Sequence, residues 1–220
     1  MPLRPRVAAV LFDFDGTVAD THGLTHRCLD ETAMQHLGVP FPLPLLEQHV
    51  GRPLADLFAL LRDGRAQAAT PIEVLVATYR AKQIDYEAQV AAYPGVAEAL
   101  QALRERSVRL AIVTTKLRSV ARRQLQRTGL AECFEVIVGF DDCAQSKPDP
   151  EPFQRALHLL GVTASAAVAV GDSPGDIHAA RAAGVTAVAA LWGCLNRAAL
   201  LTTKPDRTLS HPAELRELVR

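Results

Sequence analysis

The sequence carries no excess of charge of either sign, because 24 Lys and Arg residues balance 24 Asp and Glu residues in a chain of 220. A balanced chain offers no general electrostatic attraction to nucleic acid or to a membrane surface. Long apolar runs are also missing: the run at residues 7–12 ends at Asp13 and is too short for a signal-peptide core or a membrane span. We therefore expect a soluble, cytoplasmic protein with neither nucleic acid nor membrane as a partner.

Cysteine is scarce, and the four cysteines show no C-x-x-C spacing of the kind that marks zinc and redox sites. Free thiols in a reducing compartment are the simpler interpretation. Hydrophobic residues make up 49% of the chain. That share is enough for one sizeable core, with or without a small inserted domain.

Several short apolar runs without alternation predict strands buried on both faces, as in a parallel sheet. They span residues 7–12, 110–113 and 166–170, with weaker runs at 135–138 and 185–189. Apolar residues at helical spacing lie between them, such as Val96, Ala99, Leu100 and Leu103. This alternation, from about Pro94 onward, predicts a Rossmann-like doubly wound α/β fold.

Residues 20–92 break this rhythm, because they show helical periodicity but no convincing strand. Pro71 fits the first position of a long helix that runs towards Val90. We expect residues 1–19 and 93–220 to form the core domain. Residues 20–92 are then a helical domain inserted after the first strand.

Polar residues follow four of the predicted strands at their carboxyl ends, where ligands bind in open α/β sheets. In chain order they are Asp13 and Asp15, then Thr114, Thr115 and Lys116, then Lys147, and finally Asp172 and Asp176. Their convergence on one edge of the sheet is the main sign of a functional site in the sequence.

The carboxylates among these residues predict a cation site. Asp13 and Asp15 are two residues apart, so in extended chain they point to the same side and repel each other unless a cation or a shared proton intervenes. Mg²⁺ fits, because it needs only a few carboxylates together with water and phosphate. Asp172 and Asp176 can complete the site. Capping of the next segment is the alternative for each, above all for Asp176, which fits a capping box begun by Ser173.

The basic and hydroxyl groups predict an anion site at the same edge. Lys147 precedes Pro148 in a stiff loop, where it can hold an anionic group near the acidic cluster. Thr114 offers a hydroxyl, and the helix that follows it offers free N–H groups to a phosphate. Asp149 precedes Pro150 and is interpreted as a helix cap outside the site.

The run Asp13-Phe-Asp-Gly-Thr-Val-Ala-Asp20, followed by Thr114, Lys147 and Gly171-Asp-Ser-x-x-Asp176, resembles the four motifs of the haloacid dehalogenase superfamily. The motifs stand in order, and the match covers nearly the whole chain. The resemblance implies a Rossmann-like core with a type 1 helical cap. It further implies that Asp13 is the nucleophile that forms an aspartyl-phosphate, and that Asp15 is the general acid and then the base.

The resemblance also implies ligand roles. Thr114 and Lys147 would bind the transferring phosphoryl group. Mg²⁺ would be held by Asp13, the backbone carbonyl of Asp15 and Asp172, with Asp176 acting through water. A small phosphorylated molecule is therefore the expected substrate, and both a monomer and a dimer stay open.

Two finer features concern the substrate. Residues 112–118 and 141–152 resemble the phosphoglycolate phosphatase group and its bacterial inorganic pyrophosphatase branch. Thr115 and Lys116 lie in the first stretch and join the expected substrate-binding residues. Arg52, in a loop between two helical segments of the cap, can reach a substrate anion, with a solvated arginine beside a turn as the alternative.

Other activities of the superfamily match these residues less well. Its dehalogenases lack an acid at the position of Asp15. Sugar phosphomutases of the beta-phosphoglucomutase type carry a histidine twelve positions after the nucleophile, where this chain has Thr25 with His26 beside it, so a mutase stays an alternative. A non-catalytic binding protein on the same fold is the alternative from another class. Its expected sign, the loss of Asp13, Asp15 or Lys147, is not found.

Overall fold

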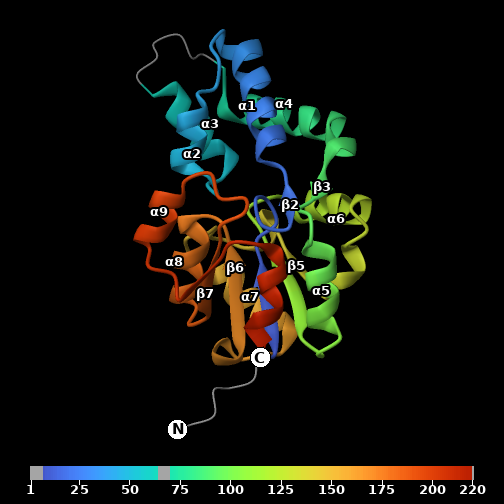
Figure 1. The fold of residues 1–220 in the computed structure, drawn as a ribbon. Helices are drawn as coiled ribbons and strands as arrows, with labels where there is room; N and C mark the ends of the chain where they lie inside the picture. Colours follow the sequence, from blue (N-terminus) through green and yellow to red (C-terminus); the bar gives the residue numbers. More distant parts are fainter. Residues whose placement is uncertain (1–6, 64–69, 220) are drawn as a thin grey trace.

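The computed structural model of the chain describes residues 7–63 and 70–219. Its centre is a sheet with helices on both sides (Figure 1). The sheet has six parallel strands in the order β5-β4-β1-β6-β7-β8. The strands are β1 (Ala9–Phe12), β4 (Arg109–Val113), β5 (Val136–Val138), β6 (Ala167–Gly171), β7 (Thr186–Ala190) and β8 (Arg207–Leu209). The predicted Rossmann-like fold is confirmed. All five predicted strands are present. The edge strand β8 was not predicted, because its sequence contains no apolar run.

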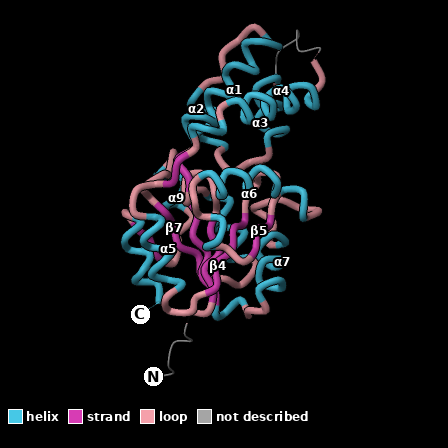
Figure 2. The backbone as a smooth tube through the Cα atoms, turned by 90° about the vertical axis from the view of Figure 1, so that its right-hand side faces the viewer, coloured by secondary structure: helices cyan, strands magenta, loops and turns pink. Residues whose placement is uncertain are grey.

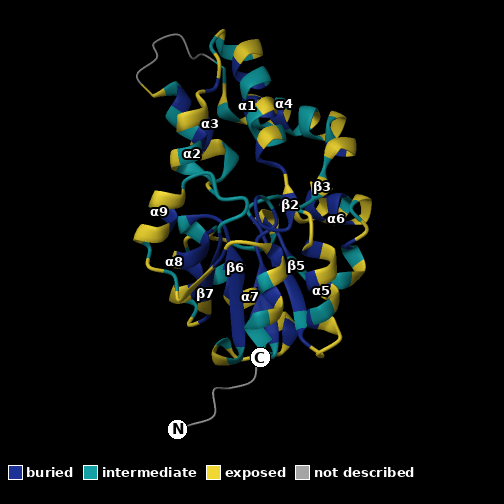
Figure 3. Cartoon of the chain, viewed as in Figure 1, coloured by how far each residue is buried: buried dark blue, intermediate teal, exposed yellow. Residues whose placement is uncertain are grey.

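Alternate side chains of each strand point into two apolar layers, one on each face of the sheet. Val10 and Phe12 belong to one layer, and Ala9 and Leu11 belong to the other. The first layer is covered by α5 (Val96–Arg104), α6 (Arg118–Arg127) and η5 (Pro212–Val219), and the second by α7 (Glu151–Leu160), α8 (Pro174–Ala182) and α9 (Arg197–Thr202). Strands β1 and β6 are buried along their whole length, and β4 and β7 are buried after their first residue (Figure 3), which explains the apolar runs of these four strands.

Four helices of the described chain lie together beyond one end of the sheet (Figures 1 and 2). They are α1 (His22–Leu37), α2 (Leu43–His49), α3 (Leu54–Arg62) and α4 (Ile72–Asp85), and we call them the inserted helices. They bury an apolar cluster of their own that includes Leu29, Phe41, Phe58 and Leu75. The domain boundaries at residues 20 and 92 stay a prediction, and residues 1–6, 64–69 and 220 of the two predicted domains lie outside the described residues.

The long helix expected from Pro71 to Val90 is shorter than predicted. Helix α4 ends at Asp85, and a separate 3-10 turn, η1 (Glu87–Gln89), follows it. The reason is tertiary. The side chain of Glu87 is buried and pairs with two arginines of α6, Arg123 at 3.2 Å and Arg127 at 3.5 Å. The chain therefore turns towards the core before the helix reaches Val90.

The prediction that residues 20–92 contain no strand is wrong at both ends of this stretch. Strands β2 (Ala19–Asp20) and β3 (Ala91–Ala92) pair antiparallel, so the chain enters and leaves the inserted helices through one two-stranded ribbon. Two residues are too few to produce a sequence pattern, and their partners lie about seventy positions away. Only the folded chain brings the two segments together.

The topology places β1 at the centre of the sheet, between β4 and β6. After β1 the chain runs outward on one side through β4 and β5, and then crosses to the other side for β6, β7 and β8. The carboxyl end of β1 is therefore the switch point of the sheet, where open α/β folds bind ligands.

In the described residues all four cysteines are free, and no helix is long and apolar enough to cross a membrane.

Candidate active site

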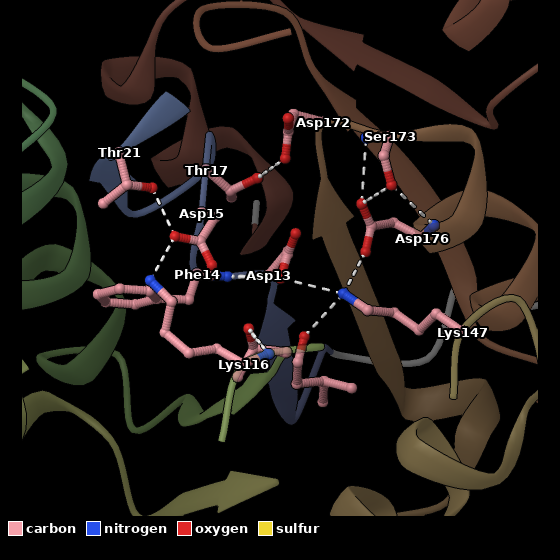
Figure 4. A network of polar contacts seen from close by, with 12 residues as sticks. Asp13, Phe14, Asp15, Thr17, Thr21, Lys116, Lys147, Asp172, Ser173 and Asp176 are labelled. Atoms are coloured by element: carbon pink, nitrogen blue, oxygen red, sulfur yellow. Dashed lines mark hydrogen bonds and ion pairs between the residues drawn. The ribbon is translucent and has the colours of Figure 1, made fainter. Parts of the chain in front are cut away.

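Asp13 follows β1 directly and is 6% exposed. Its Oδ1 accepts a hydrogen bond from the backbone N–H of Phe14 at 2.7 Å and pairs with the Nζ of Lys147 at 3.0 Å (Figure 4). Among the described residues no donor contacts its Oδ2. Asp13 also lines a cavity between the core and the inserted helices. The carboxylate is thus oriented through one oxygen, and the other is left for a ligand.

Lys147 is almost fully buried, and its ammonium group is surrounded by acceptors. Nζ lies 2.6 Å from Oδ1 of Asp176, 3.0 Å from Oδ1 of Asp13 and 3.0 Å from the carbonyl oxygen of Val113. An ammonium group has three hydrogens to donate, and each of these acceptors can take one. The structure therefore brings Lys147 to the acidic cluster, as its position in a stiff loop predicted.

Three aspartates form a group that can hold a metal ion. Asp13, Asp172 and Asp176 each offer a carboxylate oxygen, and these atoms lie within 4.8 Å of one another. A donor set made only of carboxylates suits a hard cation such as Mg²⁺, which keeps its remaining positions for water and phosphate. The residues present therefore fit the ion that the family resemblance implies.

Asp176 has two functions in the fold. Its Oδ2 accepts hydrogen bonds from the backbone N–H and the hydroxyl of Ser173 at 3.0 and 2.6 Å, which forms the predicted capping box of α8. Its Oδ1 faces Lys147 and the other carboxylates. The predicted capping box is therefore confirmed, and the same side chain also faces the other carboxylates, while its metal role stays a prediction.

Asp172 is held by two side chains that the sequence did not single out. The hydroxyl of Thr17 donates to Oδ1 at 3.0 Å, and Nε2 of His22 lies 2.9 Å from Oδ2. His22 is the first residue of α1 and lines the cavity. Its place follows from the way α1 begins next to β6, which no local sequence pattern reveals.

The carboxylate of Asp15 is not part of the metal group, contrary to the expectation that it points to the same side as Asp13. Its Oδ1 accepts hydrogen bonds from Nζ of Lys116 at 2.6 Å and from the hydroxyl of Thr21 at 2.5 Å. The backbone leaves the extended conformation after β1, and Gly16 has φ +75° in the turn that follows. A metal role for Asp15 therefore rests on its backbone carbonyl, as the resemblance implies.

The segment after β4 differs in part from its prediction. The hydroxyl of Thr114 accepts a hydrogen bond from the N–H of Lys116 at 3.1 Å. The first N–H of α6, at Arg118, donates to Oδ1 of Asp141 at 2.7 Å and is not free for a phosphate. Asp141 comes from a loop far along the chain, which the local sequence cannot show. Thr115 and Lys116 line the cavity, as expected of substrate-binding residues.

The cavity measures about 140 Å³ and is lined from both sides. Asp13, Asp15 and Asp172 line it from the core, and Arg52 lines it from the loop between α2 and α3. That loop touches the core closely: a Cβ at Gly51 would lie 2.8 Å from Oγ of Ser173. The inserted helices thus cover the carboxylates and leave a partly closed cavity between themselves and the core.

Burial and charge shift the pKa values of these groups in opposite directions. Burial raises the pKa of Asp13 well above its ordinary value, and Asp176 adds to the effect while Lys147 opposes it. Burial also raises the pKa of Asp15, but Lys116 and Thr21 outweigh it, and the net pKa is lowered. For Lys147, burial lowers the pKa, and the attraction of the two carboxylates more than restores it. Carboxylates that burial and mutual repulsion make costly to ionise gain most from a cation.

Two residues weighed in the sequence lie away from the reacting groups. The N-cap position of α7 is Pro150 and not Asp149 as predicted, but Asp149 still accepts a hydrogen bond from the N–H of Glu151, the first residue of α7, at 2.9 Å. His26 has its Nε2 2.9 Å from the carbonyl oxygen of Phe41, within the inserted helices. Thr25, at the position where a mutase carries histidine, lines the cavity instead.

Residues 10–190 match the family model of the haloacid dehalogenase-like hydrolases. The chain belongs to this family. The resemblance inferred from the four motifs is thereby confirmed, and with it the assignment of the chain as a hydrolase.

Named proteins and solved structures resemble the chain over nearly all of its length. The chain is 33% identical over 214 residues to the pyrophosphatase PpaX of Halalkalibacterium halodurans, and the match covers 97% of each of the two proteins. The crystal structure of CbbY from Rhodobacter sphaeroides in complex with phosphate has a TM-score of 0.84 at 27% identity, covering 95% of this chain and 96% of CbbY. A predicted phosphoglycolate phosphatase from Haemophilus somnus, at 22% identity with full coverage and a TM-score of 0.85, shares the fold.

Proposed function

We propose that the chain is a magnesium-dependent phosphohydrolase that passes a phosphoryl group from a small substrate to Asp13 and then to water. The observation that carries the proposal is the setting of Asp13. Its carboxylate is buried at the switch point of the sheet, oriented by Lys147, grouped with Asp172 and Asp176, and it lines a partly closed cavity. Phosphoryl transfer depends mainly on positioning and charge neutralisation, and this arrangement supplies both.

The group of three aspartates would hold Mg²⁺, which when bound supplies positive charge next to the phosphoryl oxygens. Thr17 and His22 orient Asp172 for this task, and Lys147 orients Asp13 and Asp176. The side chains that surround the ion are therefore themselves held in place, which second-layer hydrogen bonds commonly do at metal sites.

The reaction takes two steps at the chain's own residues. In the first, a carboxylate oxygen of Asp13 bonds to phosphorus, the bond from phosphorus to the leaving oxygen breaks, and that oxygen takes a proton from Asp15. In the second, Asp15 removes a proton from water, the water oxygen bonds to phosphorus, and the bond to Asp13 breaks. In the ligand-free chain Lys116 and Thr21 lower the pKa of Asp15, which favours the ionised form that the second step needs. The negative charge of a bound substrate opposes this effect and favours the protonated form that the first step needs.

Pyrophosphate and phosphoglycolate are the substrates we favour. The cavity of about 140 Å³ is smaller than the roughly 300–1,000 Å³ of pockets for drug-sized ligands. A relative that is 33% identical is named a pyrophosphatase, and CbbY was crystallised with phosphate. Nothing at Thr25 or His26 favours the mutase alternative, because neither offers a titrating group to the cavity.

We retain the predicted cytoplasmic location, since free cysteines suit a reducing compartment.

The test is Asp13→Asn, which removes the nucleophile and preserves the shape of the side chain. We expect phosphate release from pyrophosphate and phosphoglycolate in the presence of Mg²⁺ to fall by at least about 10³-fold. Asp85→Asn, which changes an exposed carboxylate at the end of α4, is the matched control and should match the unaltered protein. Turnover by Asp13→Asn near the normal rate, or no release from any substrate by the unaltered protein, would contradict the proposal.

A further inference from the structure

One face of α4 lines the roof of the cavity. Val76, Tyr79, Arg80 and Gln83 all line it, and their spacing of three, four and seven residues places them on the same side of the helix. Tyr79 is also buried in the apolar cluster of the inserted helices. The packing of Tyr79 therefore sets the rotation of α4, and this rotation turns Arg80 towards the site.

Within residues 7–63 and 70–219, Arg80 has no partner for its charge. The residue is only partly exposed, and among the described residues no carboxylate, carbonyl or hydroxyl group contacts its guanidinium. Its helix neighbour Lys82, by contrast, pairs with Glu31 at 3.6 Å. A guanidinium has five donors and no acceptor, and leaving them unpaired in a partly closed cavity is unfavourable. An anion in the cavity would relieve this cost.

The other positively charged side chains at the site already form ion pairs with carboxylates of the core. Lys116 pairs with Asp15, and Lys147 pairs with Asp13 and Asp176. In the described part of the cavity wall, the cations without such a partner are Arg80 and the exposed Arg52. Both belong to the inserted helices or their loop, opposite the carboxylates of the core. The two arginines without an ion-pair partner therefore lie on the side of the cavity opposite Asp13.

We infer that Arg80, assisted by Arg52, binds a second anionic group of the substrate while the transferred phosphoryl group lies at Asp13. The inference rests on the proposed function and deepens it. The substrate class is a compact molecule with two anionic ends, one of which leaves. A guanidinium can bind such an end through two parallel hydrogen bonds, whether it is a phosphate or a carboxylate. Arg80 is then a residue that determines specificity and takes no part in bond breaking.

The experiment compares kcat/KM for three substrates that differ in the second end. Pyrophosphate carries a phosphate there, phosphoglycolate a carboxylate, and p-nitrophenyl phosphate no anionic group before cleavage. For Arg80→Gln, we expect the ratio of kcat/KM for pyrophosphate to that for p-nitrophenyl phosphate to fall roughly 10- to 100-fold. The ratio for phosphoglycolate falls as well if the site accepts either anion, and it stays unchanged if the site requires a phosphate.

Two further variants keep the outcome decisive. Arg80→Lys retains the charge without the two-pronged geometry and should recover part of the lost ratio. Lys82→Gln removes one positive charge from the same helix outside the cavity and should leave the ratio unchanged. Equal losses on pyrophosphate and p-nitrophenyl phosphate, or no loss, would overturn the role of Arg80. That result differs from a failure of the proposed function, in which the unaltered protein releases phosphate from none of the three.

Discussion

Replacement of Lys147 by Met tests how the buried charges at the site are balanced. Nζ of Lys147 lies within 3.0 Å of Asp13, Asp176 and the carbonyl of Val113, and the residue is 4% exposed. Met has similar length but no charge and no donor. The substitution therefore leaves two buried carboxylates and a carbonyl without their shared partner.

The size of the effect follows from the burial. Removing one partner of a buried ion pair costs about 3–5 kcal/mol of unfolding free energy, because the remaining charge has no compensation. We expect a loss in this range for Lys147→Met at pH 8 without metal. The loss should shrink at pH 5. The pKa of Asp13 in the folded state is already raised, and it rises further without Lys147. As the pH falls, the folded state therefore takes up a proton before the unfolded state does, and the variant regains stability.

Urea unfolding in the presence and absence of Mg²⁺ measures these changes. Trp192 is the single tryptophan, and its Nε1 donates to the carbonyl of Thr17 at 2.9 Å, so its fluorescence reports on the site. Mg²⁺ at a hundred times its Kd should restore about 2.7 kcal/mol. The control is Lys82→Met, whose partner Glu31 is partly exposed, and it should cost about 1 kcal/mol or less. A loss below about 1 kcal/mol for Lys147→Met, or one independent of pH, would refute the reasoning.

Two other changes address the neighbours of Asp172. A Cβ at Gly16 would lie 2.2 Å from Nε2 of His22 and 2.3 Å from Oδ2 of Asp172, and φ there is +75°. Gly16→Ala should therefore cost roughly 1–3 kcal/mol and abolish the rise in melting temperature with Mg²⁺. Gly23→Ala, in α1 with nothing within 4 Å of the new Cβ, should be neutral or stabilising. In the metal-free protein, NMR titration of His22 should give a midpoint above 6.5, because Asp172 outweighs the lowering effect of burial.

The controls for these two predictions follow from the same contacts. Retention of the Mg²⁺-dependent shift in Gly16→Ala would show that Asp172 is not displaced. For His22, Asp172→Asn should lower the midpoint relative to the unaltered protein, since burial is then opposed only by the attraction of Asp15 and Asp13. The stability that charged His22 contributes is complete below pH 6.5 and is lost as the pH rises through the higher folded value. A midpoint at or below 6.5 in the unaltered protein contradicts the described ion pair.

The sequence alone is sufficient to predict the sheet apart from its edge strand β8, and the residues at the carboxyl ends of its strands. Strands buried on both faces need continuous apolar runs, and functional groups placed after such strands are brought to one edge by the topology of a parallel sheet. Asp13, Lys147, Asp172 and Asp176 meet in the structure for this reason. Each occupies a motif whose local conformation the neighbouring residues dictate, such as the capping box that holds Asp176.

Tertiary structure alone decides which groups complete the site. The carboxylate of Asp15 turns to Lys116, more than a hundred positions away, rather than to the metal group. His22 contacts Asp172, and Asp141 accepts a hydrogen bond from the first N–H of α6, through packing that no local sequence pattern encodes. Arg80 becomes a candidate for specificity only because the buried Tyr79 fixes the rotation of α4 above the cavity. Local sequence determines backbone conformation and burial, whereas contacts between distant segments depend on how whole elements pack.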